Sequence, residues 1–223
     1  MEIKINDIFK EYENFKLDIP ELNVSTNSII GLVGKNGAGK TTLLKLLYSL
    51  VYSKNMRITI DDKIYKADSK EWKSKIFFSP ETNIFPEAFK AKDIENYYKH
   101  FYSEWDSSEF YSCIELFHIP DKKVKEMSLG NKKKLSLSAA FASNSEITIL
   151  DEPLSNVDPV ERAEIKKYMA QYKAKNKCII YSSHILSEVI DLCDYLIALK
   201  DGNCVLNCSN SYLTESELLE LIK

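Results

Sequence analysis

The sequence predicts an α/β protein with a parallel sheet, a small antiparallel β subdomain and an inserted all-helical subdomain. Three observations predict this class. A glycine-rich loop at 34–42 follows an apolar strand pattern and precedes a helical one. Strand and helix patterns alternate again after residue 146, whereas the stretch 86–145 carries helical patterns and no convincing strand.

The first 85 residues carry mainly strand signals, because short apolar runs alternate with polar and turn residues. Turns are expected at Asn14, Pro20 and Asp61-Asp62. A helix is expected over 40–52. The expected strands cover 3–9, 15–19, 28–33 and 76–78, together with a hairpin over 56–64.

Helical spacing replaces strand alternation in the middle of the chain. Apolar residues recur at this spacing from Ile94 to Trp105 and again from Phe110 to Phe117. After residue 146 the patterns predict strands at 146–150, 178–181, 195–199 and 204–207, and helices at 159–173, 185–193 and 214–223, the last capped by Thr214. The chain 1–223 is therefore expected to form one domain, with a core from 1–85 and 146–223 and a helical subdomain from 86–145.

Composition excludes several classes of protein. The chain has 223 residues, of which 44% are hydrophobic, so it can bury a sizeable core. A net charge of −3 argues against nucleic-acid binding driven by bulk charge. Five cysteines without a C-x-x-C pair predict reduced thiols in a cytosolic protein. No apolar run approaches the roughly 20 residues that cross a bilayer, so a partner would have to supply any membrane span.

The loop at 34–42 has the spacing of a phosphate-binding loop. Gly34 is followed by four free positions and then by Gly39-Lys40-Thr41. Glycines at 34, 37 and 39 let several backbone N–H groups point inward, toward a polyphosphate at a helix N-terminus. Lys40 supplies a positive charge for the outer phosphates, and the Thr41 hydroxyl can ligate Mg²⁺. A glycine-rich turn without a ligand is the alternative, and spacing and flanks both disfavour it.

Two further strands are expected to end near this loop. The apolar run 147–150 ends in Asp151, which can hold Mg²⁺ on the phosphates, and in Glu152, which is suited to accept a proton from an attacking water. His184 follows the apolar strand 178–181. Parallel strands end at one sheet edge, which favours a catalytic histidine over a capping one.

Taken together, these motifs resemble those of the ATP-binding cassette ATPases, in the right order and over essentially the whole chain. Residues 34–42 match the Walker A loop, and 147–152 match the Walker B strand. The resemblance implies a P-loop NTPase (RecA-like) core and a γ-phosphate contact from His184. It also implies that Tyr12 stacks on adenine, that Ser155 and Asp158 belong to the D-loop, and that the loop residues in contact with nucleotide are Gly34, Asn36, Gly37, Ala38, Gly39, Lys40, Thr41 and Thr42.

A second motif, Ser128-Leu129-Gly130-Asn131, resembles the family signature L-S-G-G-Q and precedes a helical stretch. In the family this turn completes the nucleotide site of the opposite subunit. Leu129 and Asn131 depart from the signature, and Glu81 stands where the family has a glutamine. Glu81 remains an oxygen ligand that can act near Mg²⁺ or water.

The resemblance implies an ATP-binding and ATP-hydrolysing subunit of a transporter, with ATP and Mg²⁺ as cofactors. A second cassette, in a homodimer or heterodimer, and separate membrane permease subunits are the implied partners, and no nucleic acid is expected. The cassette would lie in the cytoplasm, peripheral to the inner face of the membrane. The signature and the Pro80-Glu81 loop resemble those of exporters. The alternatives are a soluble cassette ATPase acting on ribosomes or DNA, and a non-hydrolysing regulatory cassette.

Two surface features remain open from the sequence. The run Lys132-Lys133-Lys134 is typical of a solvated helix face, and it can also attract a partner's nucleotide. The aromatic stripe from Ile94 to Trp105 is more typical of a core than of a docking surface. In the family, however, membrane subunits insert their coupling helices beside this lobe.

Overall fold

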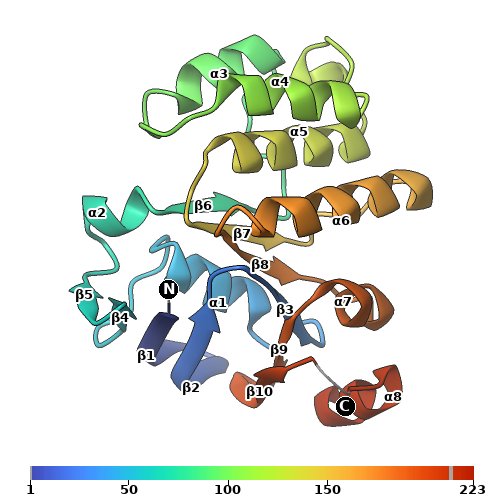
Figure 1. Cartoon of the computed structure of the whole chain (residues 1–223). Coiled ribbons are helices and arrows are strands. Elements are labelled where there is room, and N and C mark those ends of the chain that lie inside the picture. The colour runs from blue at the N-terminus through green and yellow to red at the C-terminus, as the bar shows by residue number, and fades with distance from the viewer. Residues whose placement is uncertain (1, 211–212) are drawn as a thin grey trace.

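The computed structural model describes residues 2–210 and 213–223, and its strands and helices follow the predicted alternation (Figure 1). The strands are β1 (Glu2–Tyr12), β2 (Phe15–Ser25), β3 (Ser28–Gly34), β4 (Arg57–Ile60), β5 (Lys63–Tyr65), β6 (Ile76–Ser79), β7 (Ile147–Asp151), β8 (Cys178–Ser182), β9 (Tyr195–Lys200) and β10 (Asn203–Ser209). The helices are α1 (Lys40–Leu47), α2 (Lys70–Lys73), α3 (Ala91–Tyr98), α4 (Ser107–Leu116), α5 (Leu129–Ala142), α6 (Pro159–Lys173), α7 (Leu186–Leu192) and α8 (Glu215–Ile222), with a 3₁₀ turn η1 (Val124–Glu126).

Within the described residues, the strands form one sheet of ten, in the order β5-β4-β1-β2-β10-β9-β3-β8-β7-β6. Strands β9, β3, β8, β7 and β6 run parallel, and β1, β2, β4 and β5 pair antiparallel. The small antiparallel sheet that the sequence predicts is therefore confirmed. It joins the parallel sheet through β10, which pairs with β2 at Asn203 and Asp18.

The parallel sheet is covered on both faces, which explains why its strands read as continuous apolar runs. Ile29 and Val33 of β3 belong to a core shared with α5, α6, α7 and α8. Ile30 and Leu32 point the other way, into a core shared with α1 and the antiparallel strands. The carboxyl ends of β3, β7 and β8 therefore stand at one edge of a sheet that is fixed from both sides.

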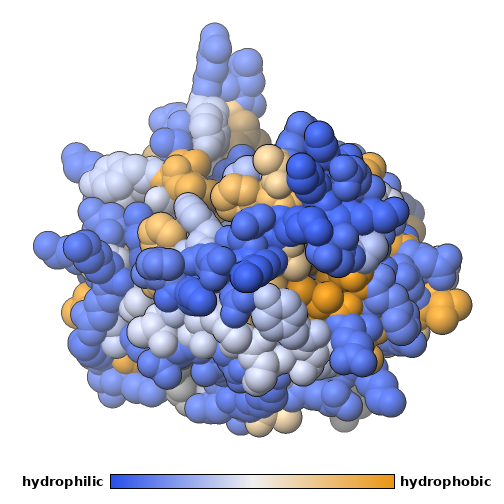
Figure 2. All heavy atoms as spheres, turned by 90° about the horizontal axis from the view of Figure 1, so that it is seen from above, coloured by the Kyte–Doolittle hydropathy of each residue, from blue (hydrophilic) through white to orange (hydrophobic). Residues whose placement is uncertain are grey.

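The helical insertion is confirmed, since the elements between β6 and β7 are α3, α4, η1 and α5. Its limits at 86 and 145 stay a prediction. Helix α5 is its centre, because eleven of its fourteen residues are buried. Seen from the side of α3 and α4, the surface is largely hydrophilic with separate apolar patches (Figure 2). Exposed apolar side chains of this region include Ile84, Tyr97 and Phe101.

Two local predictions are wrong. The turn expected at Pro20 does not occur, because β2 continues through it. The register with β1 passes from Ile8–Ile19 to Asn6–Glu21, and Asp7 between them has φ 57°. A proline is tolerated there because the ladder is locally interrupted and its missing N–H is not needed.

Helix α1 ends at Leu47 and not at residue 52. Ser49 adopts φ 60°, and the N–H groups of Leu50 and Val51 turn back to the carbonyl of Lys45, at 2.9 and 3.3 Å. This left-handed residue closes the helix in the way that glycine more often does. The hairpin turn at Asp61-Asp62 and the Thr214 cap are both confirmed.

No helix in the described part of the chain is both long and apolar enough to cross a membrane.

Candidate nucleotide site

The glycine-rich loop joins the end of β3 to the start of α1. Gly39, the residue before α1, has φ 108°, a conformation that L side chains rarely adopt. A Cβ at this position would lie 2.8 Å from the side chain of Leu17 and 2.9 Å from that of Phe15. Glycine is therefore required at 39 by backbone conformation and by the close approach of β2, independently of any ligand.

Lys40 lies inside its own loop. Its Nζ donates to the carbonyl oxygens of Gly34 at 2.7 Å and Lys35 at 3.2 Å, and the residue is 8% exposed. Burial lowers the pKa of Lys40, and the nearby carboxylates of Glu152 and Asp151 oppose this shift. The ammonium group is thus held among acceptors at the entrance of a helix, where it can be offered to a phosphate.

Asp151 is fixed from two sides. Its Oδ2 accepts a hydrogen bond from Thr41 Oγ at 3.0 Å, and its Oδ1 accepts one from Ser182 Oγ at 2.6 Å. Ser182 Oγ in turn accepts the N–H of Glu152 at 2.9 Å. The side chain of Asp151 is buried, and these bonds connect the ends of β7 and β8 to the start of α1. Ser182 was missed by the sequence reasoning, although it lies next to the apolar run that located His184.

Glu152 pairs with His184, whose Nδ1 lies 2.9 Å from Glu152 Oε2. Burial raises the pKa of Glu152, and His184 opposes this shift by charge and by its hydrogen bond. Glu152 has φ 48°, so the chain turns sharply after β7 and separates its side chain from that of Asp151. A carboxylate held this way can accept a proton, while the histidine orients it.

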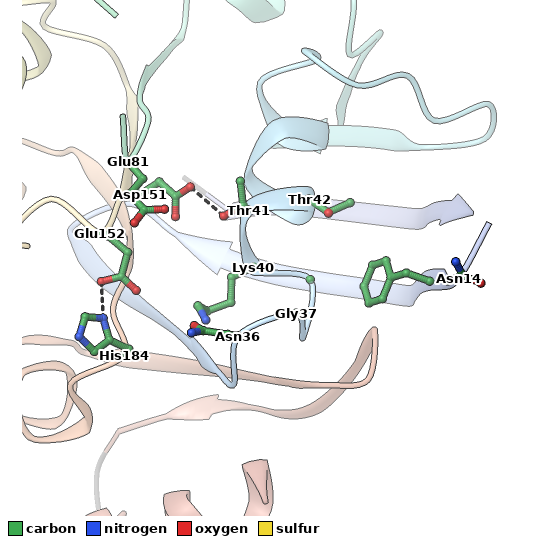
Figure 3. A pocket seen from close by; sticks show the side chains of 12 residues that line it. Asn14, Asn36, Gly37, Lys40, Thr41, Thr42, Glu81, Asp151, Glu152 and His184 are labelled. Atoms are coloured by element: carbon green, nitrogen blue, oxygen red, sulfur yellow. Dashed lines mark hydrogen bonds and ion pairs between the residues drawn. The ribbon is translucent and has the colours of Figure 1, made fainter. Parts of the chain in front are cut away.

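These side chains open onto a single cavity of about 750 Å³, within the range of small-molecule sites. In Figure 3, Glu81, Asp151, Glu152 and His184 stand on one side and the loop with Lys40 on the other. The residues that line the cavity are Asn14, Phe15, Asn36, Gly37, Gly39, Lys40, Thr41, Thr42, Glu81, Asp151, Glu152 and His184.

Three predicted nucleotide contacts lie outside that lining. Gly34 and Ala38 are buried within the loop, and Tyr12 is 43% exposed on β1. Phe15 lines the cavity and lies 6.5 Å from Tyr12, centroid to centroid. Adenine stacking by Tyr12 stays a prediction, and Phe15 is an aromatic that the sequence reasoning did not select.

The oxygen donors of the cavity suit a magnesium–nucleotide complex better than a free metal ion. Thr41 and Asp151 are in hydrogen-bond contact, and Glu81 lies beside them in the lining. Among the residues that the structure describes, no three His, Cys, Asp or Glu side chains are placed to hold a metal. Mg²⁺ characteristically takes one or two protein oxygens and completes its shell with phosphates and water, so these residues fit it.

The signature turn lies apart from this cavity. Ser128 caps α5 by accepting the N–H of Asn131 at 3.2 Å, and Leu129 is 61% exposed. A Cβ on Gly130 would come within 2.6 Å of the carbonyl oxygen of Asn156, so this glycine lets α5 approach the turn before α6. Among the described residues lining the cavity, none comes from 128–131.

The two predicted D-loop residues make local bonds. Ser155 Oγ donates to the carbonyl of Glu152 at 2.8 Å, and Asp158 caps α6 by accepting the N–H of Val160 at 2.9 Å. Asn156 between them has φ 61°. Their bonds fix the chain between the end of β7 and α6, and a role toward nucleotide stays a prediction.

The solvated helix face predicted for the lysine run is wrong for Lys133 and Lys134, whereas Lys132 is half-buried and attraction of a partner's nucleotide stays a prediction. Lys133 is 9% exposed and Lys134 is 3% exposed. Lys134 Nζ bonds Glu161 of α6 at 2.6 Å, and Lys133 Nζ donates to the backbone oxygen of Asp151 at 3.5 Å. Burial lowers the pKa of Lys133, and Glu81 opposes this shift most strongly.

A family model described as "ABC transporter" matches residues 17–155, more than half of the chain. The chain belongs to the ABC transporter ATPases, as an ATP-binding cassette. The family resemblance predicted from the motifs is thereby confirmed. The matched range contains the phosphate loop, the signature turn and the carboxylates at the end of β7.

Relatives of this cassette include three bacterial proteins. The ABC transporter ATP-binding protein YtrB of Bacillus subtilis is 30% identical over 82% of this chain and 63% of its own length. NatA of the same organism is 28% identical over 89% and 84%. The ribose import ATP-binding protein RbsA of Clostridium tetani is 31% identical over 92% and 43%. The cassette therefore spans less than two thirds of YtrB and RbsA.

Solved structures share the fold of this cassette. An ATP-binding subunit of an ABC transporter superposes with a TM-score of 0.86, at 21% identity and full coverage of both chains. The cassette MJ0796, described as dimeric and bound to ADP and Pi, superposes with a TM-score of 0.78 at 18% identity, over 95% of this chain and 100% of its own.

Proposed function

We propose that this cassette binds ATP between two copies and hydrolyses it, and that the resulting motion drives transport through separate membrane subunits. One observation carries the proposal. The phosphate loop, the Thr41–Asp151 contact and the Glu152–His184 pair all face the same cavity. This set of groups can bind a triphosphate, neutralise its charge and accept the proton of an attacking water.

Each residue has a distinct part in this reaction. The loop N–H groups hold the β and γ phosphates, and Lys40 leaves its carbonyl acceptors to contact them. Water attacks the γ-phosphorus, the bond to the β–γ bridging oxygen breaks, and Glu152 accepts a proton from the water. His184 holds the Glu152 carboxylate in place, and the family resemblance supports a contact from His184 to the γ-phosphate.

The proposed metal ligands are Thr41, Asp151 and Glu81. Bound Mg²⁺ neutralises the phosphate charge that develops during transfer. Ser182 keeps Asp151 in position through the 2.6 Å bond, and Thr41 is already aligned by its contact with Asp151. The carboxylate of Glu81, in place of the family's amide, adds a negative charge that attracts the metal.

The dimer is supported by what the cavity of one copy does not include. The signature residues 128–131 lie outside it, and Leu129 exposes 61% of its surface. A second copy facing the first can bring its Ser128 hydroxyl and the N-terminus of its α5 to the open side of the nucleotide. MJ0796, which shares the fold, is described as a dimer.

A membrane subunit is the partner proposed for the helical subdomain. A cavity of about 310 Å³ between β6 and α3 is lined by Ile84, Phe85, Pro86, Phe89, Ile94, Tyr97 and Tyr98. Apolar side chains around it give an inserted helix a surface to bury. This partner would hold the cassette at the cytoplasmic face of the membrane. The alternative partner is a ribosome or DNA. Co-purification with an integral membrane protein, and not with ribosomes or DNA, is the expected result.

Export is the direction that the Ser128-Leu129-Gly130 turn and the Pro80-Glu81 loop favour by resemblance. RbsA, a relative, is described as an import protein, so relatives alone do not fix the direction. Uptake by inverted membrane vesicles that depends on ATP outside them would support export. Release of preloaded substrate from such vesicles would instead support import.

The deciding test of hydrolysis is Glu152→Gln, which keeps the shape of the side chain and removes its basic oxygen. We expect phosphate release to fall at least about 100-fold and ATP to trap a dimer, read by size-exclusion chromatography. Glu164→Gln on the exposed face of α6 makes the same chemical change away from the cavity and serves as the control. Release at the parental rate would contradict the role of Glu152. ATP binding without release by the parental protein would support the regulatory alternative.

A further inference from the structure

Lys133 is a buried cation without a carboxylate partner of its own. It is 9% exposed, and among the described residues no carboxylate oxygen lies within 4 Å of its Nζ. Its recorded bond is the 3.5 Å contact with the backbone oxygen of Asp151. A buried charge of this kind is costly unless a nearby field compensates it.

The compensating field comes from the nucleotide cavity. The carboxylates of Glu81, Asp151 and Glu152 oppose the lowering of the Lys133 pKa by burial, Glu81 most strongly. The same three carboxylates oppose the lowering of the Lys40 pKa by burial, Glu152 most strongly. Two lysines therefore lie beside one acidic cluster. Lys40 lines the nucleotide cavity with these carboxylates, and Lys133 lines a cavity with Glu81 and donates to the backbone oxygen of Asp151.

Lys134, the next residue on the helix, shows what an ordinary buried lysine does here. It bonds Glu161 at 2.6 Å on α6, away from the cavity. Lys133 has no such local partner and instead faces carboxylates that are proposed to hold a metal ion. The two neighbours thus differ in what their charge acts on, although both are buried.

The position of Lys133 depends on how α5 sits against the core. Glu81 and Lys133 line a common cavity of about 240 Å³ with the side chain of Ser136. Ser136 Oγ lies 2.7 Å from Ser79 Oγ at the end of β6, and Gly130 packs against Asn156. These contacts hold the ammonium beside the acidic cluster, and a displacement of α5 would carry it away.

We propose that Lys133 is a positioning residue whose ammonium group competes electrostatically with a divalent cation for Glu81 and Asp151. The position of α5 against the core then determines the affinity of the site for the metal ion. The inference rests on the proposed function, because it takes Glu81 and Asp151 as the metal-side residues of a nucleotide site. It adds a residue of the helical subdomain that acts on the metal through charge.

The test measures binding of Mn²⁺, a paramagnetic stand-in for Mg²⁺, to the full chain with saturating ADP. The paramagnetic resonance signal of free Mn²⁺ gives the affinity once the Mn²⁺ that ADP binds without protein, measured in a parallel titration, is subtracted. Lys133→Gln keeps a donor toward Asp151 and removes the charge, so we expect about tenfold tighter Mn²⁺ binding. Lys122→Gln removes the same charge from an exposed lysine of the helical subdomain that lines neither cavity, and as the control it should change affinity less than about twofold. Lys133→Arg keeps the charge and should resemble the parent.

Unchanged or weaker Mn²⁺ binding by Lys133→Gln would overturn the inference, as would equal tightening by Lys133→Arg. ADP binding without metal, measured by calorimetry, separates the two levels of argument. If the parent does not bind ADP, the proposed function fails and the inference fails with it. If ADP binds normally and the Lys133 variant leaves Mn²⁺ affinity unchanged, only the inference fails.

A variant that removes both the Glu81 and the Lys133 charge keeps the test decisive if Lys133→Gln alone does not fold. Glu81 is exposed, so Glu81→Gln should fold, and it should weaken Mn²⁺ binding by about tenfold. The double variant Glu81→Gln/Lys133→Gln removes one charge of each sign and should return close to parental affinity. A double variant as weak as Glu81→Gln would contradict the proposed competition.

Discussion

The nucleotide cavity and the signature turn differ in how much support the chain gives them. Asp151 is held by Thr41 and Ser182, and Glu152 is held by His184, so the cavity side chains are oriented by internal bonds. The signature turn has a helix cap and a close glycine contact beneath it, but Leu129 is largely exposed. The cavity groups are thus pre-oriented within one chain, whereas the turn leaves an exposed side chain that the proposed second copy would cover.

Mixing two inactive variants tests this division most strongly. Lys40→Ala removes the phosphate-binding charge, and Ser128→Asp keeps a good helix cap while placing a negative charge where a partner's phosphate would lie. Each variant alone should hydrolyse ATP at least about 100-fold more slowly. An equal mixture should recover activity in steady-state phosphate release, because mixed dimers contain one site with both halves intact.

The control mixture combines Lys40→Ala with the double variant Lys40→Ala/Ser128→Asp. It contains no intact pair of halves and should stay inactive. If the first mixture shows only the average of its two components, the turn of one chain does not complete the site of another.

Gly130→Ala tests the support beneath the turn. The added Cβ would lie 2.6 Å from the carbonyl oxygen of Asn156, and a backbone atom cannot move aside cheaply. We expect the free energy of unfolding to fall by about 1–3 kcal/mol, measured by urea denaturation. Asn131→Ala, on the same turn, should stay within about 0.5 kcal/mol. Equal stability of the two variants would mean that α5 is not held by this contact.

Ser182→Ala tests the support within the cavity. It leaves one buried oxygen of Asp151 without its donor and the N–H of Glu152 without its acceptor. The cost should be about 1–2 kcal/mol in urea denaturation, together with a lower kcat for ATP hydrolysis. Ser183→Ala, one residue later, removes a hydroxyl that bonds the N–H of Ile185 and should leave kcat less affected. A parental kcat in Ser182→Ala would show that Asp151 needs no such anchor.

Sequence reasoning found what local patterns encode. The strands of the parallel sheet are buried on both faces and read as apolar runs, so β3, β7 and β8 were placed to within about two residues. The phosphate loop and the carboxylates after β7 follow from spacing. These local signals predicted one site for Lys40, Thr41, Asp151, Glu152 and His184. In the structure all five line one cavity.

What the sequence could not supply depends on contacts between distant elements. Three successive lysines usually mark an exposed face, and nothing local says that α5 is enclosed by α4, α6 and the sheet. The lining role of Phe15 depends on the close approach of β2 to Gly39. Pro20 suggests a turn, and only the interrupted pairing at Asp7 explains a strand there.

Thiol labelling compares how readily the helical subdomain and the core sheet open, and here we expect the smallest effect. Burial raises the pKa of Cys113 in α4 to about 12 and that of Cys178 in β8 to about 12. The thiolate is the reactive form of cysteine, and a raised pKa leaves less of it at pH 8. Both thiols should therefore be labelled slowly at pH 8, and faster at higher pH or when the structure opens around them. Mass spectrometry of the labelled peptides reads the two positions separately.

Nucleotide should then slow Cys178 more than Cys113. Cys178 pairs with Ser28 of β3 and Ile147 of β7, so exposing it separates the strands that carry the phosphate loop and Asp151. With ADP at about three times its Kd, labelling of Cys178 should slow about fourfold, and Cys113 less, since α4 contributes no side chain among the described residues of the cavity lining. Lys40→Ala should weaken the effect by weakening ADP binding. Equal protection of both thiols would mean that the helical subdomain and the core sheet open together. The cavity and the signature turn would then differ in how their side chains are oriented, but not in the free energy of opening of the regions that carry them.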